Sequence, residues 1–151
     1  MARDFFTQIE QARKRYERRM ASLHKKICSD LFRRVILKTP VDTDQARGNW
    51  MLGINVVPIS VSDDADGDES LRNVITGLQA LKPGDTAVLA NSVPHIGVLE
   101  YGGYPDPPKN PTGKTVGGYS IQAPQGMVRI TVEEYRPTLN RAIKEAKKET
   151  R

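Results

Sequence analysis

The stretch DFFTQIEQARKRYERRMASLHKKICSDLFRRVILK, residues 4–38, decides the fold. Apolar side chains recur in it every three or four residues, which is the spacing of one face of an α-helix. Neither glycine nor proline interrupts the stretch, and Pro40 pushes the residue before it out of helical geometry. We therefore predict a helix from Asp4 to Lys38. The apolar positions are Phe5, Ile9, Ala12, Tyr16, Met20, Leu23, Ile27, Leu31 and Val35.

This predicted helix is long for a chain of 151 residues. At about 1.5 Å per residue it spans about 50 Å, which exceeds the diameter of a domain of this size. Part of the helix must therefore extend beyond the rest of the domain. An apolar face on an extending helix needs a partner to cover it, so the length indicates an oligomer.

Charge is distributed unevenly along the chain. Residues 1–38 carry 11 Lys and Arg against 4 Asp and Glu (+7), residues 39–128 carry 5 against 10 (−5), and residues 129–151 carry 7 against 4 (+3). Basic ends flank an acidic middle, and the net charge is +5. This polarity suits a subunit that meets copies of itself head to tail at least as well as it suits a DNA-binding protein.

The sequence offers no sign of secretion or of a membrane span. No apolar run approaches the roughly 20 residues that cross a bilayer. The first 19 residues are charged and lack the apolar centre of a secretory signal, so we expect the chain to start in a cytoplasm. Cys28 is the single cysteine, which excludes an internal disulfide and favours a reducing compartment.

Shorter elements follow the long helix, and together they predict an α+β fold in a single domain. Asp42 or Thr43 is expected to cap a short turn of helix through Arg47. The other predicted elements, in order, are a strand over residues 50–62 with Pro58 at an edge or a bulge, an acidic loop over 63–69, a helix over 70–81, a strand over 86–90, a helix over 94–101, a loop over 102–120 and a helix from Met127 to Lys148.

Two of these segments leave alternatives open or lack structure of their own. The loop over 102–120 is so rich in proline and glycine that we expect no packed element within it. The β-branched residues between positions 127 and 133 fit either a helix or a strand. Pro137 either kinks the last helix or begins a second one.

The expected organisation is a helix over 1–38, a core of small antiparallel sheet and helices over 39–101, the loop over 102–120, and a helical segment over 121–151.

The search for metal and phosphate sites finds only partial matches. His24 and Cys28 are one helical turn apart, but two ligands do not make a structural zinc site. Residues 63–69 resemble a calcium-binding loop, although Gly67 stands at the wrong offset and the final glutamate is missing. Residues 113–115, GKT, imitate a phosphate-binding loop that lacks its first glycine. We therefore predict no metal and no cofactor.

Catalysis and nucleic-acid binding are weighed on different residues. Glu100 and His95 could form an acid–base pair, but no nucleophile or oxyanion site accompanies them, so a structural hydrogen bond is favoured and no catalytic residue is predicted. The Lys and Arg residues of the first helix suit phosphate contacts. No recognition-helix motif follows them, and aromatic residues are only 6% of the chain. A basic DNA-binding module remains the alternative to a structural assembly protein.

Three stretches, in order along the chain, resemble the signatures of one family. Residues 39–50 resemble the segment after the first helix, residues 91–102 the second signature, and residues 122–128 a proline-glycine entry to the last helix. The family is that of the tail-completion, or head–tail joining, proteins of long-tailed bacteriophages. Asp44 stands where the family usually has glycine. The positions that carry the resemblance are Pro40, Val41, Asp42, Thr43, Arg47, Trp50, Pro94, Leu99, Glu100, Gly102, Pro124, Gly126 and Met127.

This resemblance implies a non-enzymatic component of the virion neck that is assembled in the host cytoplasm. The implied form is a ring of identical copies, for example a hexamer, that contacts the head connector and the tail terminator or tail tube. Genome DNA would pass nearby without specific binding. The resemblance supplies no catalytic residue. Within residues 102–120 we expect the partner-docking positions to be Tyr104, Pro105, Pro107, Pro108, Lys114 and Tyr119.

Overall fold

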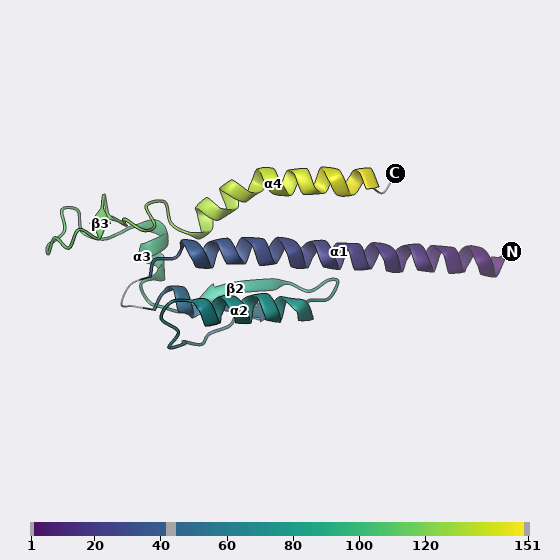
Figure 1. Ribbon diagram of the computed structural model, residues 1–151, viewed down its shortest axis with the longest axis horizontal. Coiled ribbons are helices and arrows are strands. Elements are labelled where there is room, and N and C mark those ends of the chain that lie inside the picture. The colour runs from purple at the N-terminus through teal and green to yellow at the C-terminus, as the bar shows by residue number, and fades with distance from the viewer. Residues whose placement is uncertain (1, 42–44, 150–151) are drawn as a thin grey trace.

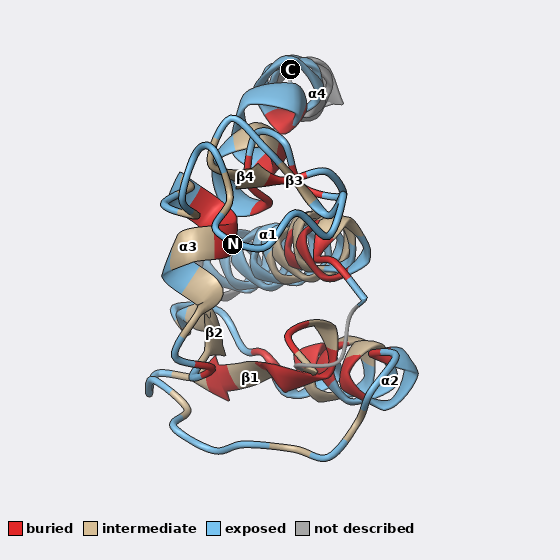
Figure 2. Ribbon diagram, turned by 90° about the vertical axis from the view of Figure 1, so that its left-hand side faces the viewer, coloured by how far each residue is buried: buried red, intermediate tan, exposed pale blue. Residues whose placement is uncertain are grey.

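The computed structural model describes residues 2–41 and 45–149. The molecule is elongated and has three layers, which two perpendicular views show in the same order (Figures 1 and 2). The predicted α+β fold, with a long first helix, a C-terminal helix and a small antiparallel sheet, is confirmed. In order, the layers are helix α4 (Val128–Glu149), helix α1 (Ala2–Lys38), and a layer that contains strands β1 (Trp50–Ile54) and β2 (Ala87–Asn91) with helix α2 (Asp68–Gly77).

Helix α1 forms as its periodicity predicts and ends where Thr39 precedes Pro40. Its two halves differ in burial. Every residue from 4 to 20 is exposed, whereas Val35 and Ile36 near the other end are buried. Figure 1 shows the N-terminal end of α1 extending past all other elements. We call residues 4–20 the projecting half of α1.

The strand predicted over residues 50–62 is shorter than expected. β1 ends at Ile54 because the next residue, Asn55, has a left-handed φ of 59°. The chain then turns back so tightly that a Cβ on Gly53 would collide with the carbonyl oxygen of Val56. β1 pairs with β2 in antiparallel register, and Asn55 prolongs the contact by donating its main-chain N–H to the carbonyl of Thr86 at 2.8 Å.

The acidic loop predicted over residues 63–69 ends two residues early, because α2 begins at Asp68. The carboxylate of Asp64 accepts hydrogen bonds from the main-chain N–H groups of Gly67 at 3.1 Å and Ser70 at 2.8 Å. These bonds satisfy donors that the first turn of a helix leaves without partners. Asp64 of the predicted acidic loop therefore caps the beginning of α2.

Two 3₁₀ turns complete this layer, and one of them corrects a prediction. The short turn expected to run through Arg47 begins there, as η1 (Arg47–Asn49), and no side chain caps it. The predicted caps Asp42 and Thr43, like Asp44, lie outside the described residues. The helix predicted over 70–81 consists of α2 followed by η2 (Leu78–Ala80).

The segment over 102–120, which we call the arm, contains an element that the sequence analysis excluded. It follows helix α3 (Ile96–Tyr101) and includes a hairpin of strands β3 (Thr115–Val116) and β4 (Tyr119–Ser120). Gly117 and Gly118 join the two strands with φ values of 58° and 79°. Two consecutive residues with positive φ are what a tight two-residue hairpin turn requires, so this glycine pair forms structure here.

Helix α4 resolves both alternatives for the C-terminal segment. Residues 128–149 are helical, and Pro137 lies inside the helix and does not begin a second one. Figure 1 shows α4 bent within its length. A proline inside a helix removes one main-chain hydrogen bond and crowds the carbonyl four residues earlier, which accounts for a bend.

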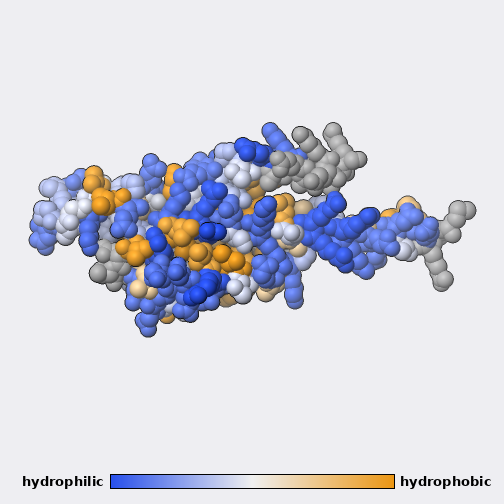
Figure 3. Space-filling model, viewed as in Figure 1, coloured by the Kyte–Doolittle hydropathy of each residue, from blue (hydrophilic) through white to orange (hydrophobic). Residues whose placement is uncertain are grey.

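The hydrophobic core lies around the second half of α1. It is built from that helix, the sheet, α2, α3 and the start of α4. Figure 3 shows hydrophobic side chains gathered where the sheet meets α1 and hydrophilic ones along the projecting half. The buried members of the hydrophobic core are Cys28, Val35, Ile36, Ala46, Trp50, Val74, Leu78, Leu99, Ala123 and Met127.

Candidate functional site

The first signature stretch closes the C-terminal end of α1. The side chain of Arg47 donates from Nε to the carbonyl of Thr39 at 2.8 Å and from Nη2 to that of Leu37 at 3.2 Å. The indole Nε1 of Trp50 donates to Thr39 Oγ1 at 2.7 Å, and that hydroxyl donates to the carbonyl of Val35 at 2.8 Å. The last carbonyls of a helix have no hydrogen-bond donors within the helix. Here residues of the first signature stretch supply those donors.

The second stretch is tied to the first through Asn91. This residue pairs with Trp50 across the sheet, and its side-chain Nδ2 donates to the carbonyl of Ala46 at 2.7 Å. Its Oδ1 accepts from the N–H of Val93 at 3.1 Å, just before Pro94 and the start of α3. Asn91 therefore fixes where α3 begins relative to η1.

The third stretch meets the second at Glu100. Its buried carboxylate lies at the N-terminal end of α4, where Oε2 accepts the main-chain N–H of Met127 at 2.7 Å and of Val128 at 2.9 Å. Oε1 accepts both the main-chain N–H of Arg129 at 2.9 Å and its Nε at 3.1 Å. Arg129 Nη2 also donates to the carbonyl of Glu100. A carboxylate placed there satisfies the free donors of the helix and stabilises its positive end.

The protonation states of this pair follow from these bonds. Burial by itself raises the pKa of Glu100, but the hydrogen bonds from Arg129, Met127 and Val128 outweigh it, and the pKa lies below its ordinary value. The pKa of Arg129 is raised, mainly because its guanidinium forms a hydrogen bond to Tyr119 and also because it forms one to Glu100. The same guanidinium lies over the ring of Tyr101, 4.8 Å from its centroid. Arg129 therefore links α3, α4 and the arm.

Two glycines of the signatures are required by close approach. Gly126 has a φ of 78°, and a Cβ there would lie 2.5 Å from the carbonyl oxygen of Glu100. Gly102 has a φ of 77°, and a Cβ there would lie 2.9 Å from the ring of Tyr119. Both positions combine a left-handed backbone with a neighbour that leaves no room for a side chain. Glycine at 126 therefore permits the close contact with Glu100, and glycine at 102 permits the close contact with Tyr119 of the arm.

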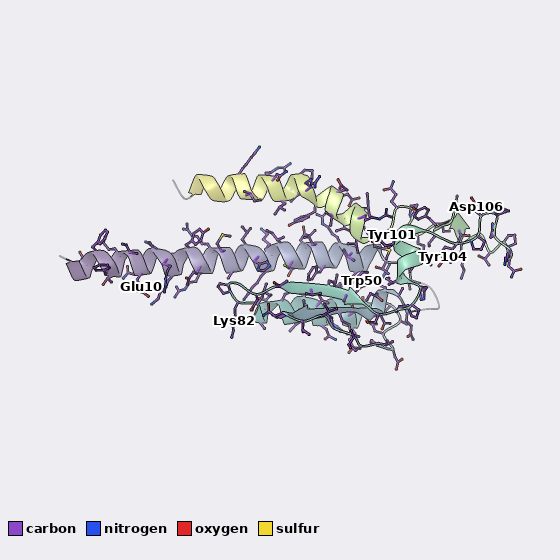
Figure 4. The ribbon with its side chains drawn as sticks, turned by 180° about the vertical axis from the view of Figure 1, so that it is seen from behind. Glu10, Trp50, Lys82, Tyr101, Tyr104 and Asp106 are labelled. Atoms are coloured by element: carbon purple, nitrogen blue, oxygen red, sulfur yellow. The ribbon has the colours of Figure 1, made fainter. Side chains whose placement is uncertain are left out.

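The arm is fastened to this junction and covers a pocket of about 340 Å³. The main-chain N–H groups of Gly103 and Tyr104 both donate to the carbonyl of Gly118, which holds the beginning of the arm against its hairpin. Figure 4 shows Trp50, Tyr101 and Tyr104 at this end of the molecule, with Asp106 further out on the arm and Glu10 at the other end. Residues that line the pocket include Pro40, Ala46, His95, Leu99, Tyr104, Pro105, Pro108, Lys114 and Gln122.

The predicted partner-docking positions therefore separate into two groups. Four of the six, Tyr104, Pro105, Pro108 and Lys114, line the pocket. Pro107 is exposed on the arm, while Tyr119 packs on Gly102 and bonds to Arg129.

The residues of the partial catalytic and metal-binding motifs have other positions and contacts in the structure. Glu100 binds α4, whereas His95 lines the pocket. Cys28 is buried in the core, and burial raises the pKa of its thiol. Asp64 and its neighbours start α2, and within residues 2–41 and 45–149 no group of three or more His, Cys, Asp or Glu could hold a metal ion.

The sequence analysis missed Arg129. It singled out Glu100, Gly126 and Met127 but gave no role to the arginine that binds the same carboxylate. A single arginine in the first turn of a helix carries no signal, because arginine is common on exposed helical surfaces. Only the approach of α3 to α4 reveals its position.

Comparisons with known proteins give no neighbour from which a role could be transferred. No family profile matches the chain, and no curated protein or solved structure shows significant similarity to it. In the part of the chain that the structure describes, no helix is both long and apolar enough to traverse a bilayer.

Proposed function

We propose that this chain is a non-enzymatic structural subunit of a bacteriophage neck, which forms a ring that completes the tail and joins it to the head connector. The observation that carries the proposal is the junction between Glu100 and the residues Met127 and Val128. It brings two of the three resembling stretches into direct contact, while Asn91 ties in the remaining one. Stretches that resemble one family in sequence order thus also form one structural unit.

Several polar side chains of the signature stretches are hydrogen-bonded within the protein itself, which supports a structural role. The Glu100 carboxylate accepts one hydrogen bond from Met127 and three from the first turn of α4, and the lowered pKa keeps it ionised, which is unsuited to a general acid. Arg47 and Trp50 are bound to the end of α1. These side chains hold elements in place and are not directed at an open cavity.

The arm is the proposed contact with the next component. It carries exposed prolines, including Pro105 and Pro107, between α3 and the β3–β4 hairpin, and the hairpin is fastened to the beginning of the arm. We propose that it binds an adjacent subunit or the tail tube, in a virion neck assembled in the host cytoplasm. An arm fixed at its base loses less conformational freedom on binding than a free segment does.

The test replaces residues 105–112 with a Gly-Ser linker of equal length in the phage that encodes the chain. This change keeps the β3–β4 hairpin and the bonds to Gly118. The expected result is a folded subunit, full heads and full tails by electron microscopy, and few joined particles. The proposal is wrong if infectious particles form in normal number, or if mass spectrometry finds no copy of the chain in purified virions.

A second candidate function, a basic DNA-binding module, is favoured by the projecting half of α1. Arg15, Arg18 and Arg19 are exposed there. Affinity for duplex DNA that persists at physiological salt, and falls when these three are changed to glutamine, would support it. Binding that fades steeply between about 50 and 200 mM salt is what any basic surface shows and would leave the neck proposal in place.

A further inference from the structure

The projecting half of α1 presents a stripe of exposed apolar side chains. Phe5, Ile9, Tyr16 and Met20 are 61%, 50%, 56% and 44% exposed. At about 100° per residue these four side chains fall within about 60° of one another around the helix axis. The exposed part is about 25 Å long. A helix of this length is marginal alone in water, and packing of its apolar face would stabilise it.

One edge of this stripe is basic. By helical geometry Arg15 and Arg19 lie along the same side of the stripe. Arg13 and Lys14 are paired on α1 itself, with Glu10 and, for Arg13, also Glu17. Among the described residues, by contrast, no carboxylate forms an ion pair with Arg15 or Arg19. The projecting half therefore offers an apolar strip with a positive border.

A second exposed surface has the opposite charge. Val56, Val57, Ile59 and Val61 are 62%, 62%, 86% and 70% exposed. The segment runs directly into residues 63–69, which contain the exposed acids Asp63, Asp66, Asp68 and Glu69. We call residues 56–69 the valine-acid segment.

The two surfaces lie apart within one molecule. The valine-acid segment runs from the end of β1 into the first residues of α2, and its loop lies on the side of that layer that faces away from α1 (Figure 2). The projecting half extends from the molecule as part of one uninterrupted helix (Figure 1). A helix without a break cannot fold back onto the far side of its own domain. Contact between the two surfaces therefore needs a second copy.

We propose that the projecting half of α1 of one copy docks on the valine-acid segment of a neighbouring copy. The apolar stripe covers the valines and Ile59, and Arg15 and Arg19 lie against Asp66 and Asp68. Each copy then gives one surface and receives the other, a head-to-tail contact that produces a ring when its rotation closes. The identity of the ring as a neck rests on the proposed function; the contact itself does not.

Charge exchange tests the contact in the full chain. The wild type should assemble in sedimentation velocity, and R15E/R19E or D66K/D68K should each weaken assembly at least about tenfold. The combined chain R15E/R19E/D66K/D68K should recover it. The matched control K14E/R18E makes the same change of charge on the opposite face of α1 and should assemble as the wild type does. Loss of assembly in the control, or no recovery in the combined chain, would overturn the proposal.

Cross-linking identifies the partner of the projecting half. A mixture of Tyr16→Cys and Ile59→Cys chains should give disulfide-linked pairs that contain one of each; Cys28 is buried and stays unreacted. Pairs of two Tyr16→Cys chains would show that projecting helices pair with each other, and a chain that is monomeric up to about 1 mM would show no contact; either result refutes the proposal. If the chains cross-link in this mixed pattern but purified virions contain no copy of the chain, the proposed contact stands and only the proposed neck function is overturned.

Discussion

The carboxylate of Glu100 receives the main-chain N–H of Met127 at 2.7 Å, so a residue of α3 supplies the N-terminal cap of α4. A cap is usually the residue just before its helix. Here it comes from a separate element, which makes the start of α4 depend on the docking of α3. The stability of the C-terminal helix is therefore coupled to the junction that holds the arm.

Replacing Glu100 with glutamine should destabilise the fold by about 1–3 kcal/mol, because the amide keeps one acceptor oxygen but loses the charge and presents donors to the N–H groups of α4. Urea unfolding followed by circular dichroism measures the change. Glu133→Gln, an exposed change further along α4, should alter the free energy of unfolding by less than about 0.5 kcal/mol. Equal effects of the two changes would contradict the capping role.

Acid should weaken the fold through the same carboxylate. The pKa of Glu100 in the folded chain lies below its ordinary value of 4.5, so between those two values the unfolded chain binds the proton more readily. The stabilisation from Glu100 is complete above about pH 5 and is lost as the pH falls through the folded pKa. Urea midpoints measured from pH 7 to pH 3 should fall less steeply for Glu100→Gln than for the wild type. Parallel curves would refute the assignment.

Gly126→Ala and Gly84→Ala form a matched pair, since both glycines have positive φ, 78° and 90°. At Gly84 a Cβ meets nothing within 4 Å, so alanine should cost about 1 kcal/mol for the backbone conformation alone. At Gly126 the Cβ would also press on Glu100, which should add about 1–3 kcal/mol. Thermal unfolding of the two variants measures the difference. A Gly126→Ala chain as stable as Gly84→Ala would exclude the close contact.

Two buried threonines should respond to valine with opposite signs. No described residue gives Thr131 Oγ1 a hydrogen bond, so Thr131→Val should stabilise the fold by about 1 kcal/mol. Thr39 Oγ1 accepts the indole N–H of Trp50, so Thr39→Val should destabilise it by about 1–3 kcal/mol by leaving a buried donor unpaired. Exposed Thr138→Val is the control and should stay within about 0.5 kcal/mol of the wild type. Chemical denaturation decides each sign.

The predictions that succeeded depended on local patterns. Helix α1 follows from its uninterrupted three- and four-residue spacing and from Pro40 at its end. The stretch over residues 91–102, which contains Glu100, was recognised as significant, yet the function of Glu100 as a cap for α4 was not, because a hydrogen bond between residues far apart in sequence leaves no periodic signal. Arg129 was missed for the same reason.

The predictions that failed depended on single residues that change the backbone. β1 ends at Ile54 because Asn55 adopts positive φ, although the apolar pattern continues through Val61. The arm was expected to lack packed structure, but Gly117 and Gly118 form the turn of a hairpin. Composition describes how flexible such a segment is on average, and it does not distinguish a glycine that loosens the chain from one that completes a turn.

The amino-acid order alone was enough to specify a long amphipathic helix, its excess length and the opposed charges of the segments, since these depend on neighbours along the chain. Folding in three dimensions decided that α4 is a helix from Val128, that the second and third signature stretches meet at Glu100, and that the projecting half of α1 and the valine-acid segment face different directions. These outcomes depend on groups brought together across the fold, whose energies exceed the weak local preferences of β-branched residues.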